Sequence, residues 1–311
     1  MAFWRGKNKF SYIENVGTAI GFGAQKDMEG GKTYFVNCNT GSDGYSGRNP
    51  NNPLATLEAA EAKCVTAKHD YIIVQDFWTL TTESPIVFNK TDMHVISLGS
   101  GILFDNGNDI DSAAANAAVQ LEGCTDLELA GFNIGGSVSG ASYDAITVVG
   151  TTFRVHLHHC TFGNNYACLN GIGEGAVGNM GKWLVEDCFF GAATAGDGIN
   201  CSSLSSMVRN CLFYKVALKG IDLPAGQTWN KYLNNQFYSS IALGHDSGWG
   251  ITLRATCADN MVYGSRAADT GDSAGNEPYR DESTDSVATM LNSWCDNMWG
   301  ADQIAPDKSD S

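Results

Sequence analysis

A short pattern of apolar and polar positions recurs along the middle of the chain. It consists of an apolar residue, two variable residues, then Cys, Asn or Ala, any residue, and usually Phe. Six segments carry it, namely Leu127–Phe132, Leu157–Phe162, Val185–Phe190, Val208–Phe213, Tyr232–Phe237 and Cys257–Val262. Their last residues follow one another at steps of 30, 28, 23, 24 and 25 positions. Such a repeat is typical of a solenoid with coils of unequal loop length.

The pattern predicts a bend inside each segment. The first apolar residue and the final Phe are five positions apart, so along a straight strand they would point to opposite faces. A bend at the variable pair, for example His158–His159, lets both point inward while the pair faces water. Successive coils then lie about 4.8 Å apart, so like residues should stack. We expect an aromatic ladder and a cysteine ladder, formed by Phe162, Phe190, Phe213 and Phe237 and by Cys160, Cys188 and Cys211.

A second marker runs in step with the first and indicates the start of another strand. It is a small residue followed by isoleucine, at Ala145-Ile146, Gly171-Ile172, Gly198-Ile199, Gly220-Ile221 and Gly250-Ile251. Two or three strands per coil fit this spacing better than a propeller blade of roughly 40 residues. We therefore predict an all-β, single-stranded right-handed parallel β-helix from about residue 70 to about residue 265. The alternative is a sandwich of hairpins, which has no reason to repeat Cys and Phe at a fixed offset.

Residues 34–60 carry a motif that is informative about architecture. Gly41-Ser42-Asp43 follows an apolar stretch, and Pro53-Leu54-Ala55-Thr56 precedes a run of Leu and Ala. This order resembles the entry segment of the pectate-lyase-like β-helix superfamily, and the likeness continues to about residue 265. The resemblance implies a short helix, which we place at 53–66, capping the open end of the solenoid. It says little about activity, because that superfamily includes lyases, hydrolases, adhesins and phage tailspikes.

Four parts are expected along the chain. They are an extended attachment or assembly arm at 1–33, an entry strand and capping helix at 34–66, the parallel β-helix at 67–268, and a C-terminal cap and tail at 269–311. The arm is rich in aromatic residues without a helix or strand period, as in segments that order against a partner. Within 287–299, Met290, Leu291, Trp294 and Met298 have helical spacing, which predicts a second capping helix.

Composition and charge exclude some partners. Hydrophobic residues make up 43% and charged residues 17%, with 36 glycines, which suits a large core and many tight turns. A formal net charge of −15 argues against nucleic acid. We see no apolar run long enough to span a membrane and no secretory signal after the basic start. The ten cysteines are dispersed, so we expect them to be reduced and buried.

Catalytic residues are harder to place. The resemblance to pectate lyases implies clustered Asp with calcium and an Arg base, and the resemblance to polygalacturonases implies Asn-Thr-Asp, Asp-Asp, Gly-His-Gly and Arg-x-Lys motifs. None of these sets is present, and residues 244–248 lack the glycine that would follow His245. Asp144, Asp197 and Asp222 lie beside the second marker, where neighbouring coils would gather them on one face as a carboxylate pair for glycoside cleavage. The alternative is that they are turn residues.

Two further groups are candidates for binding. His156, His158 and His159 have ligand chemistry, but no fourth ligand is evident, so we interpret them as solvated corner residues and predict no metal and no cofactor. Trp229 and Trp249 lie in glycine-rich loops. Exposed rings there would contact either a carbohydrate or a neighbouring subunit.

Two classes of function remain. The first is a virion structural protein of a phage or virus: a tailspike, fibre or capsid decoration, made in the host cytoplasm, that forms a homotrimer, contacts other virion proteins through residues 1–33 and binds surface carbohydrate. The second is a polysaccharide lyase or glycoside hydrolase acting on an acidic polysaccharide. The lack of an export signal and of the family catalytic sets favours the first class, without catalysis. A bacterial adhesin would need an export route.

Overall fold

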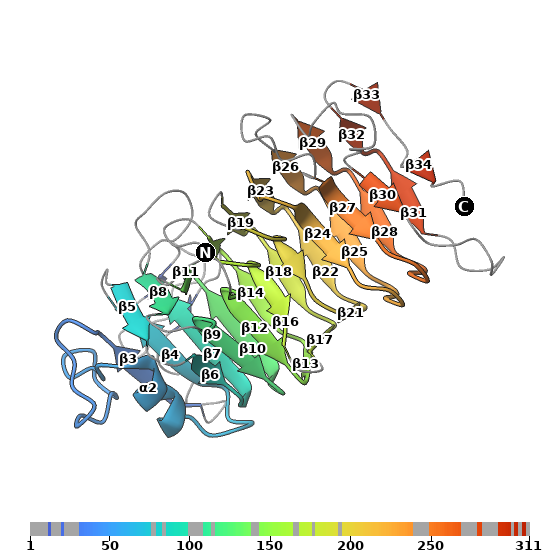
Figure 1. Cartoon of the computed structure of the whole chain (residues 1–311). Coiled ribbons are helices and arrows are strands. Elements are labelled where there is room, and N and C mark those ends of the chain that lie inside the picture. The colour runs from blue at the N-terminus through green and yellow to red at the C-terminus, as the bar shows by residue number, and fades with distance from the viewer. Residues whose placement is uncertain are drawn as a thin grey trace.

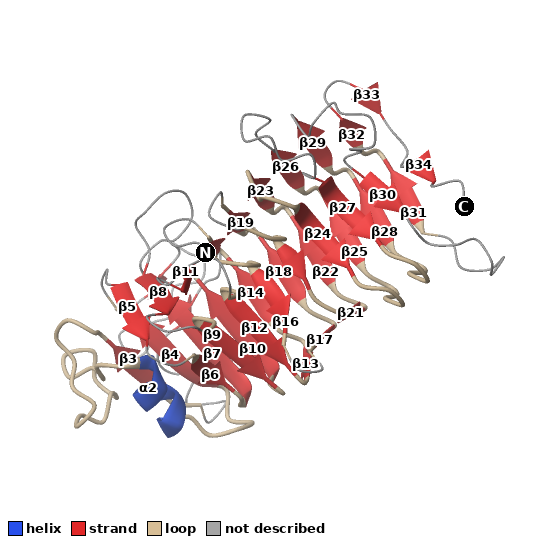
Figure 2. Cartoon of the chain, in the orientation of Figure 1, coloured by secondary structure: helices blue, strands red, loops and turns tan. Residues whose placement is uncertain are grey.

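The computed structural model describes residues 31–75, 79–82, 85–98, 108–112, 116–137, 143–163, 168–175, 178–191, 195–238, 249–268, 279–281 and 292–299, and the short strands at 12–13, 20–21, 302–303 and 307–308. The chain winds as a coil that adds a strand to each of three sheets in turn (Figures 1 and 2). Strands that neighbour each other in these sheets come from successive coils and run parallel, except that the last two strands of one sheet, at 298–299 and 302–303, pair antiparallel. The predicted right-handed parallel β-helix is confirmed.

The three sheets extend along one axis. Sheet I contains β3 (Thr33–Val36), β4 (Asp70–Val74), β7 (Thr91–Ser97), β10 (Thr125–Ala130), β13 (Thr151–Phe153), β14 (His156–His158), β17 (Asn179–Gly181), β18 (Leu184–Glu186), β21 (Ser203–Leu204), β22 (Met207–Arg209), β25 (Lys231–Leu233), β28 (Met261–Tyr263) and β31 (Ser293–Cys295). Sheet II contains β5 (Thr79–Thr82), β8 (Asn108–Ser112), β11 (Phe132–Ser137), β15 (Thr161–Phe162), β19 (Phe189–Phe190), β23 (Leu212–Tyr214), β26 (Gln236–Tyr238), β29 (Arg266–Ala268), β32 (Met298–Trp299) and β33 (Asp302–Gln303). Sheet III contains β6 (Ile86–Phe88), β9 (Val119–Glu122), β12 (Ile146–Val149), β16 (Ile172–Glu174), β20 (Ile199–Asn200), β24 (Lys219–Leu223), β27 (Trp249–Leu253), β30 (Tyr279–Asp281) and β34 (Asp307–Lys308).

The predicted aromatic ladder runs through the core behind sheet II. Phe162, Phe190, Phe213 and Phe237 pair in register from β15 to β26. Their ring centroids are 4.7, 4.5 and 4.8 Å apart along the stack, and the planes are within 18° of parallel. These spacings equal the distance between hydrogen-bonded strands, so the ladder is a direct product of coil stacking.

The glycines of the second marker explain why the two sequence markers occur together. A Cβ built on Gly171 would lie 2.6 Å from the ring of Phe190, and one on Gly198 would lie 2.6 Å from the ring of Phe213. Each ring therefore fills the space that a side chain on the glycine would need. Phenylalanine in sheet II and glycine before the isoleucine of sheet III form one packing unit.

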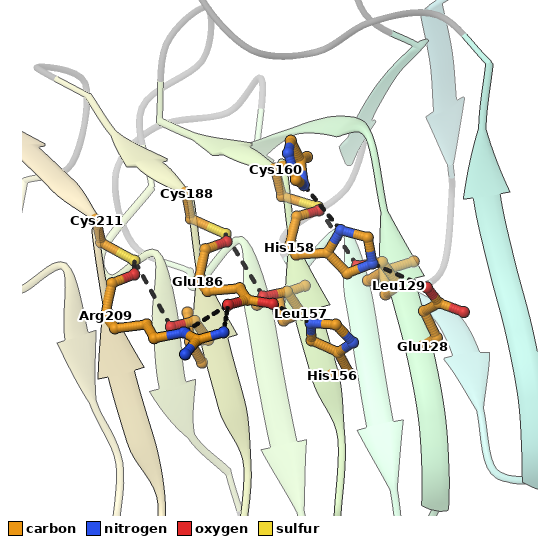
Figure 3. A network of polar contacts seen from close by, with 12 residues as sticks. Glu128, Leu129, His156, Leu157, His158, Cys160, Glu186, Cys188, Arg209 and Cys211 are labelled. Atoms are coloured by element: carbon orange, nitrogen blue, oxygen red, sulfur yellow. Dashed lines mark hydrogen bonds and ion pairs between the residues drawn. The ribbon is translucent and has the colours of Figure 1, made fainter. Parts of the chain in front are cut away.

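The cysteine ladder is confirmed as well. Cys160, Cys188 and Cys211 are buried. Each thiol lies 3.3 to 3.4 Å from the carbonyl oxygen two residues earlier in its own chain segment and 3.8 Å from a carbonyl oxygen of the preceding coil (Figure 3). None of the ten cysteines forms a disulfide, as predicted, but the expectation that all are buried was wrong for Cys38, which is half-buried, and for Cys295, which is exposed.

Two of the six segments were placed in the wrong register. Leu129, not Leu127, pairs with Leu157, so Ile134 lies above Phe162 in the ladder. A slip of two residues keeps the same side chains pointing inward, so the pattern alone cannot detect it.

The last segment was displaced further. Val262 pairs with Tyr232, and Ala267 rather than Val262 lies below Phe237. Asn260 lies in the turn before sheet I, where its Oδ1 accepts a hydrogen bond from Asn230 Nδ2 at 3.0 Å.

The bend between sheets I and II occurs where the variable pairs predicted it. His159, Asp187 and Asn210 adopt the left-handed conformation with φ of 56°, 52° and 54°. This conformation turns the chain sharply without a proline or glycine. The expectation that both members of each pair face water was wrong for His158, which is buried.

The N-terminal cap is a helix at α2 (Leu57–Lys63), inside the predicted 53–66. The Thr56 hydroxyl accepts a hydrogen bond from the Ala59 N–H at 3.1 Å and so caps the helix start. Leu57 and Ala60 are buried against the first coil, together with Leu54 before the helix. The helix thus covers the apolar end of the solenoid (Figure 2).

The far end differs from the expectation. A helix was predicted within 287–299, but β31 and β32 occupy 293–295 and 298–299, and Trp294 pairs with Val262 as the next rung of sheet I. Neighbouring coils impose strand geometry on this short segment and override its helical spacing. Of the expected arm at 1–33, the structure describes β1 (Tyr12–Ile13) and β2 (Ile20–Gly21), which pair antiparallel, and residues 31–33, the last of which begins β3. The described part of the chain has no helix long and apolar enough to cross a bilayer.

Candidate functional site

The three carboxylates predicted beside the second marker lie along one strip of sheet III. Asp144 and Asp197 stand at the same position in two coils, two residues before the paired isoleucines, and Asn170 stands there in the coil between them. Asn170 Nδ2 donates to Asp144 Oδ1 at 2.8 Å, and Asn170 Oδ1 accepts from the Asp197 N–H at 2.9 Å. Asp222 lies in β24, where the residues on either side of it point into the core, so its carboxylate is on the outer face. We call this set the sheet III strip.

Asp197 and Asp222 lie in neighbouring coils and differ in acidity. Asp197 accepts hydrogen bonds from the Lys219 backbone N–H at 3.0 Å and from Asn200 Nδ2 at 2.8 Å. Burial, and next the charge of Asp222, raises the pKa of Asp197 to about 6. Burial alone would also raise the pKa of Asp222, but hydrogen bonds from Arg254 and Lys219 outweigh it and hold that pKa below its ordinary value. Between the two pKa values the pair holds a single proton, on Asp197.

Two cations cover Asp222. Lys219 Nζ donates to Asp222 Oδ2 at 2.7 Å, and Arg254 Nε donates to Oδ1 at 2.9 Å. The Asp222 side chain is 1% exposed, whereas those of Lys219 and Arg254 are 21% and 47% exposed. The strip therefore presents positive charge to solvent above a buried carboxylate. Asp197 also stabilises the turn before β24, because it accepts a hydrogen bond from the Lys219 N–H. It therefore has the role of a turn residue, which was the alternative to a catalytic role.

The two candidate tryptophans lie at different sheets. Trp229 is in the turn before β25 of sheet I, in the left-handed conformation, and its side chain is 61% exposed. Trp249 is the first residue of β27 in sheet III, where its backbone pairs with Lys219, but its side chain lies outside the described residues. Residues 244–248, with His245, also lie outside them. Contact of either tryptophan with carbohydrate or a subunit stays a prediction.

A second polar cluster lies on the outer face of sheet I (Figure 3). Strand pairing aligns His94 of β7, Glu128 of β10 and His156 of β14 in one row, and it aligns His158 of β14 with Glu186 of β18 in the next row. Glu128 Oε1 accepts from His158 Nε2 at 2.9 Å, and Oε2 accepts from His94 Nδ1 at 2.7 Å. His156 Nε2 donates to Glu186 Oε1 at 2.8 Å. We call these residues, with His159 and Arg209, the sheet I cluster.

The sheet I cluster is partly enclosed. The His158 side chain is 2% exposed and that of Glu128 is 14% exposed. Ile73, Ile96 and Ala130 precede His158 in the same outward row and are also buried. The interpretation of His158 as a solvated corner residue was therefore wrong, because this stretch of the outer face is covered.

Hydrogen bonds set the charges of the cluster. Burial alone would raise the pKa of Glu128, but hydrogen bonds from His158 and His94 outweigh it and hold that pKa well below its ordinary value. Burial, and next the proximity of His158, lowers the pKa of both His156 and His159. At pH 7 the cluster thus combines an ionised carboxylate with neutral imidazoles at His156 and His159.

The sequence pointed to His156, His158 and His159 of this cluster but not to His94 or to the carboxylates. Glu128 and Glu186 come from the coils before and after His156 and are 28 and 30 residues away from it in the sequence, so no local motif links them. The available signal was the repeat itself, since each acid occupies the strand before a bend in its own coil. Misplacing the segment that contains Glu128 by two residues hid its position beside His156.

Comparisons with known proteins bear on the fold. No family model matches the chain, and no curated protein matches it in sequence. Among solved structures it is similar to the GH136 lacto-N-biosidase from Eubacterium ramulus, with a TM-score of 0.52 at 13% identity over 87% of this chain and 56% of that one. An alginate lyase from Paenibacillus sp. matches with a TM-score of 0.50 at 14% identity over 88% of this chain and 89% of that one. A pectate lyase matches with a TM-score of 0.48 at 14% identity over 78% and 65%.

The fold is a right-handed parallel β-helix, which is the architecture that the resemblance of residues 34–60 implies. Identities of 13 to 14% carry the architecture only. The activity has to be argued from the side chains of this chain.

Proposed function

We propose that this chain is a carbohydrate-acting β-helix protein with its glycan site on the sheet III strip. The observation that carries the proposal is the pair Asp197 and Asp222, whose pKa values are driven apart, the first to about 6 and the second below its ordinary value. Most glycoside hydrolases use such a pair. The protonated carboxyl donates to the leaving oxygen, and the ionised one attacks the sugar or activates water.

The charges of the strip favour an acidic polysaccharide. Arg254 donates through two nitrogens to the two carboxylate oxygens of Asp222, and the carboxylate of a uronic acid fits a guanidinium in the same bidentate way. A uronate that takes Arg254 and Lys219 as partners releases Asp222 to face the sugar ring. The chain has a formal net charge of −15, so these two cations are a local attraction for an anionic polymer.

A panel of polysaccharides tests the proposal. The protein is incubated with alginate, polygalacturonate, hyaluronan and a neutral glucan, and both reducing ends and the ultraviolet absorbance of unsaturated products are followed. We expect reducing ends from an acidic polymer without unsaturated products. Asp197→Asn should abolish the release, whereas Asp126→Asn, which removes an exposed partner of Arg154 on sheet I, should not.

The other outcomes are distinct. If unsaturated products form and are lost when residues of the sheet III strip are changed, the reaction is an elimination and not a hydrolysis. If the protein binds a polymer without forming any product, and Arg254→Gln abolishes that binding, the strip is a carbohydrate-binding site without catalysis. A folded protein that neither retains nor cleaves any polymer would overturn the proposal.

A place in a virion is a further proposal, which rests on the acidic composition and on the aromatic-rich residues 1–33. Of that arm, the structure describes β1, β2 and residues 31–33. We propose a homotrimer held and attached through this arm. Size-exclusion chromatography with light scattering should give three chains per particle for the full-length protein and fewer when residues 1–30 are removed. A monomer at high concentration would contradict it.

A further inference from the structure

We propose that Glu128, His156 and His158 form a binding site for a divalent transition metal ion such as Zn²⁺. One ligand atom from each residue lies within 4.8 Å of the ligand atoms of the other two. Two imidazoles and one carboxylate are the donors of open zinc sites and of two-histidine, one-carboxylate iron sites. The site lies on sheet I and shares no residue with the sheet III strip, so it is independent of the proposed function.

His156 is prepared for a metal by the groups behind it. Its Nε2 donates to Glu186 Oε1 at 2.8 Å, and Arg209 holds the other oxygen of Glu186. With Nε2 protonated, the lone pair of the neutral ring is on Nδ1. A carboxylate behind the imidazole is the usual second partner of a metal-bound histidine, because it orients the ring and makes the nitrogen more basic.

The other two ligands also have such partners. Glu128 Oε2 accepts from His94, whose ring stacks on Tyr71 at a centroid distance of 4.4 Å and an interplanar angle of 11°. His158 Nδ1 lies 2.8 Å from His159 Nδ1. When His158 ligates through Nε2, its Nδ1–H donates to His159, which satisfies both rings. Every proposed ligand is thus oriented by a second side chain from sheet I or its bend.

The separation of the ligand atoms suits an ion. Glu128 Oε1 and His158 Nε2 are 2.9 Å apart, whereas two tetrahedral ligands that each lie about 2.1 Å from one zinc ion are roughly 3.4 Å apart, so a small shift of these side chains admits the ion. A proton now bridges these atoms, and the metal replaces it. His158 is 2% and Glu128 14% exposed, whereas His156 is 34% exposed, so the ion is sheltered on one side and reached past His156. Three protein ligands leave a position for water or a small anion.

Cobalt binding tests the site. Full-length protein is freed of metal with a chelator and titrated with Co²⁺, which reports its coordination by visible absorption, and bound metal is counted by mass spectrometry. We expect one equivalent that Zn²⁺ displaces. His156→Gln and Glu128→Gln should each abolish the band, and Glu186→Gln should weaken binding by about 10- to 100-fold.

A matched control and a fold check make the result decisive. His69→Asn removes an exposed histidine in a left-handed turn, a conformation that Asn tolerates, and should bind cobalt as the wild type does. Far-ultraviolet circular dichroism confirms that each variant is folded, and His156→Gln changes a partly exposed side chain. Absence of a cobalt band in wild type, or an unchanged band in both ligand variants, would overturn the proposal. Either outcome leaves the polysaccharide assays unaffected.

Discussion

Gly220 and Phe237 test whether the coils depend on rings packed into glycines. A Cβ on Gly220 would lie 2.3 Å from Cε1 of Phe237 and 2.7 Å from the carbonyl oxygen of Gly250. Gly220→Ala must therefore displace the ring or the neighbouring strand. Overpacking of this kind lowers the free energy of unfolding by about 1–3 kcal/mol. Phe237→Leu loses buried area and stacking and should cost a similar amount, about 1–3 kcal/mol.

The two changes should be strongly non-additive. Leucine at 237 leaves room for the methyl group at 220, so the double variant should lose less than the sum of the single losses, by about 1 kcal/mol or more. Urea unfolding followed by circular dichroism provides the four free energies. Gly44→Ala is the matched control, since its Cβ would meet only the Ser42 hydroxyl at 3.5 Å, and it should add to Phe237→Leu. Losses at 220 and 237 that add within about 0.5 kcal/mol would refute the packing argument.

Three further predictions concern the site, the core and the cap. Because the pKa of Asp197 rises from 3.8 to about 6 on folding, its ionisation destabilises the fold as the pH rises through that range. Asp197→Asn should raise the unfolding free energy by about 3 kcal/mol at pH 8 and by almost nothing near pH 3.5, and an equal effect at both would contradict the shift. In native protein at pH 8 a thiol reagent should modify the exposed Cys295 first and the half-buried Cys38 slowly, with the eight buried cysteines reacting only in urea; Cys295→Ser should remove the fast phase. Thr56→Ala should lower stability by about 1 kcal/mol, with Thr56→Ser near wild type in the same urea titration.

The architecture could be predicted because every coil repeats the same local requirements. The packing of Phe190 against Gly171 is repeated in later coils by other Phe and Gly pairs, since each ring needs a glycine beside it. The bend at Asp187 and Asn210 recurs because the chain must turn there. Such local patterns can be recognised without knowing which distant residues are in contact, and their repetition made them detectable in a single sequence.

The candidate sites were less accessible. Asp144, Asp197 and Asp222 could be predicted to share a face, because they accompany the second marker. The differing acidity of Asp197 and Asp222 could not be predicted, since it comes from the burial of Asp197 and from the two cations beside Asp222. One of these cations, Arg254, is 32 residues away from Asp222. Three histidines of the sheet I cluster, His156, His158 and His159, were visible in the sequence, but the position of Glu128 beside them depends on a register that the pattern left undecided.

The amino-acid sequence by itself determined that the chain coils, where it bends, which side chains stack inside and how the first coil is capped. Positions that point inward must be apolar, so they can be recognised in the sequence. Only the tertiary structure decided the register of the first and last segments, the strands in place of a C-terminal helix, and the neighbours on the outer faces. Outward positions carry no such requirement, and loops of unequal length set which of them meet in space.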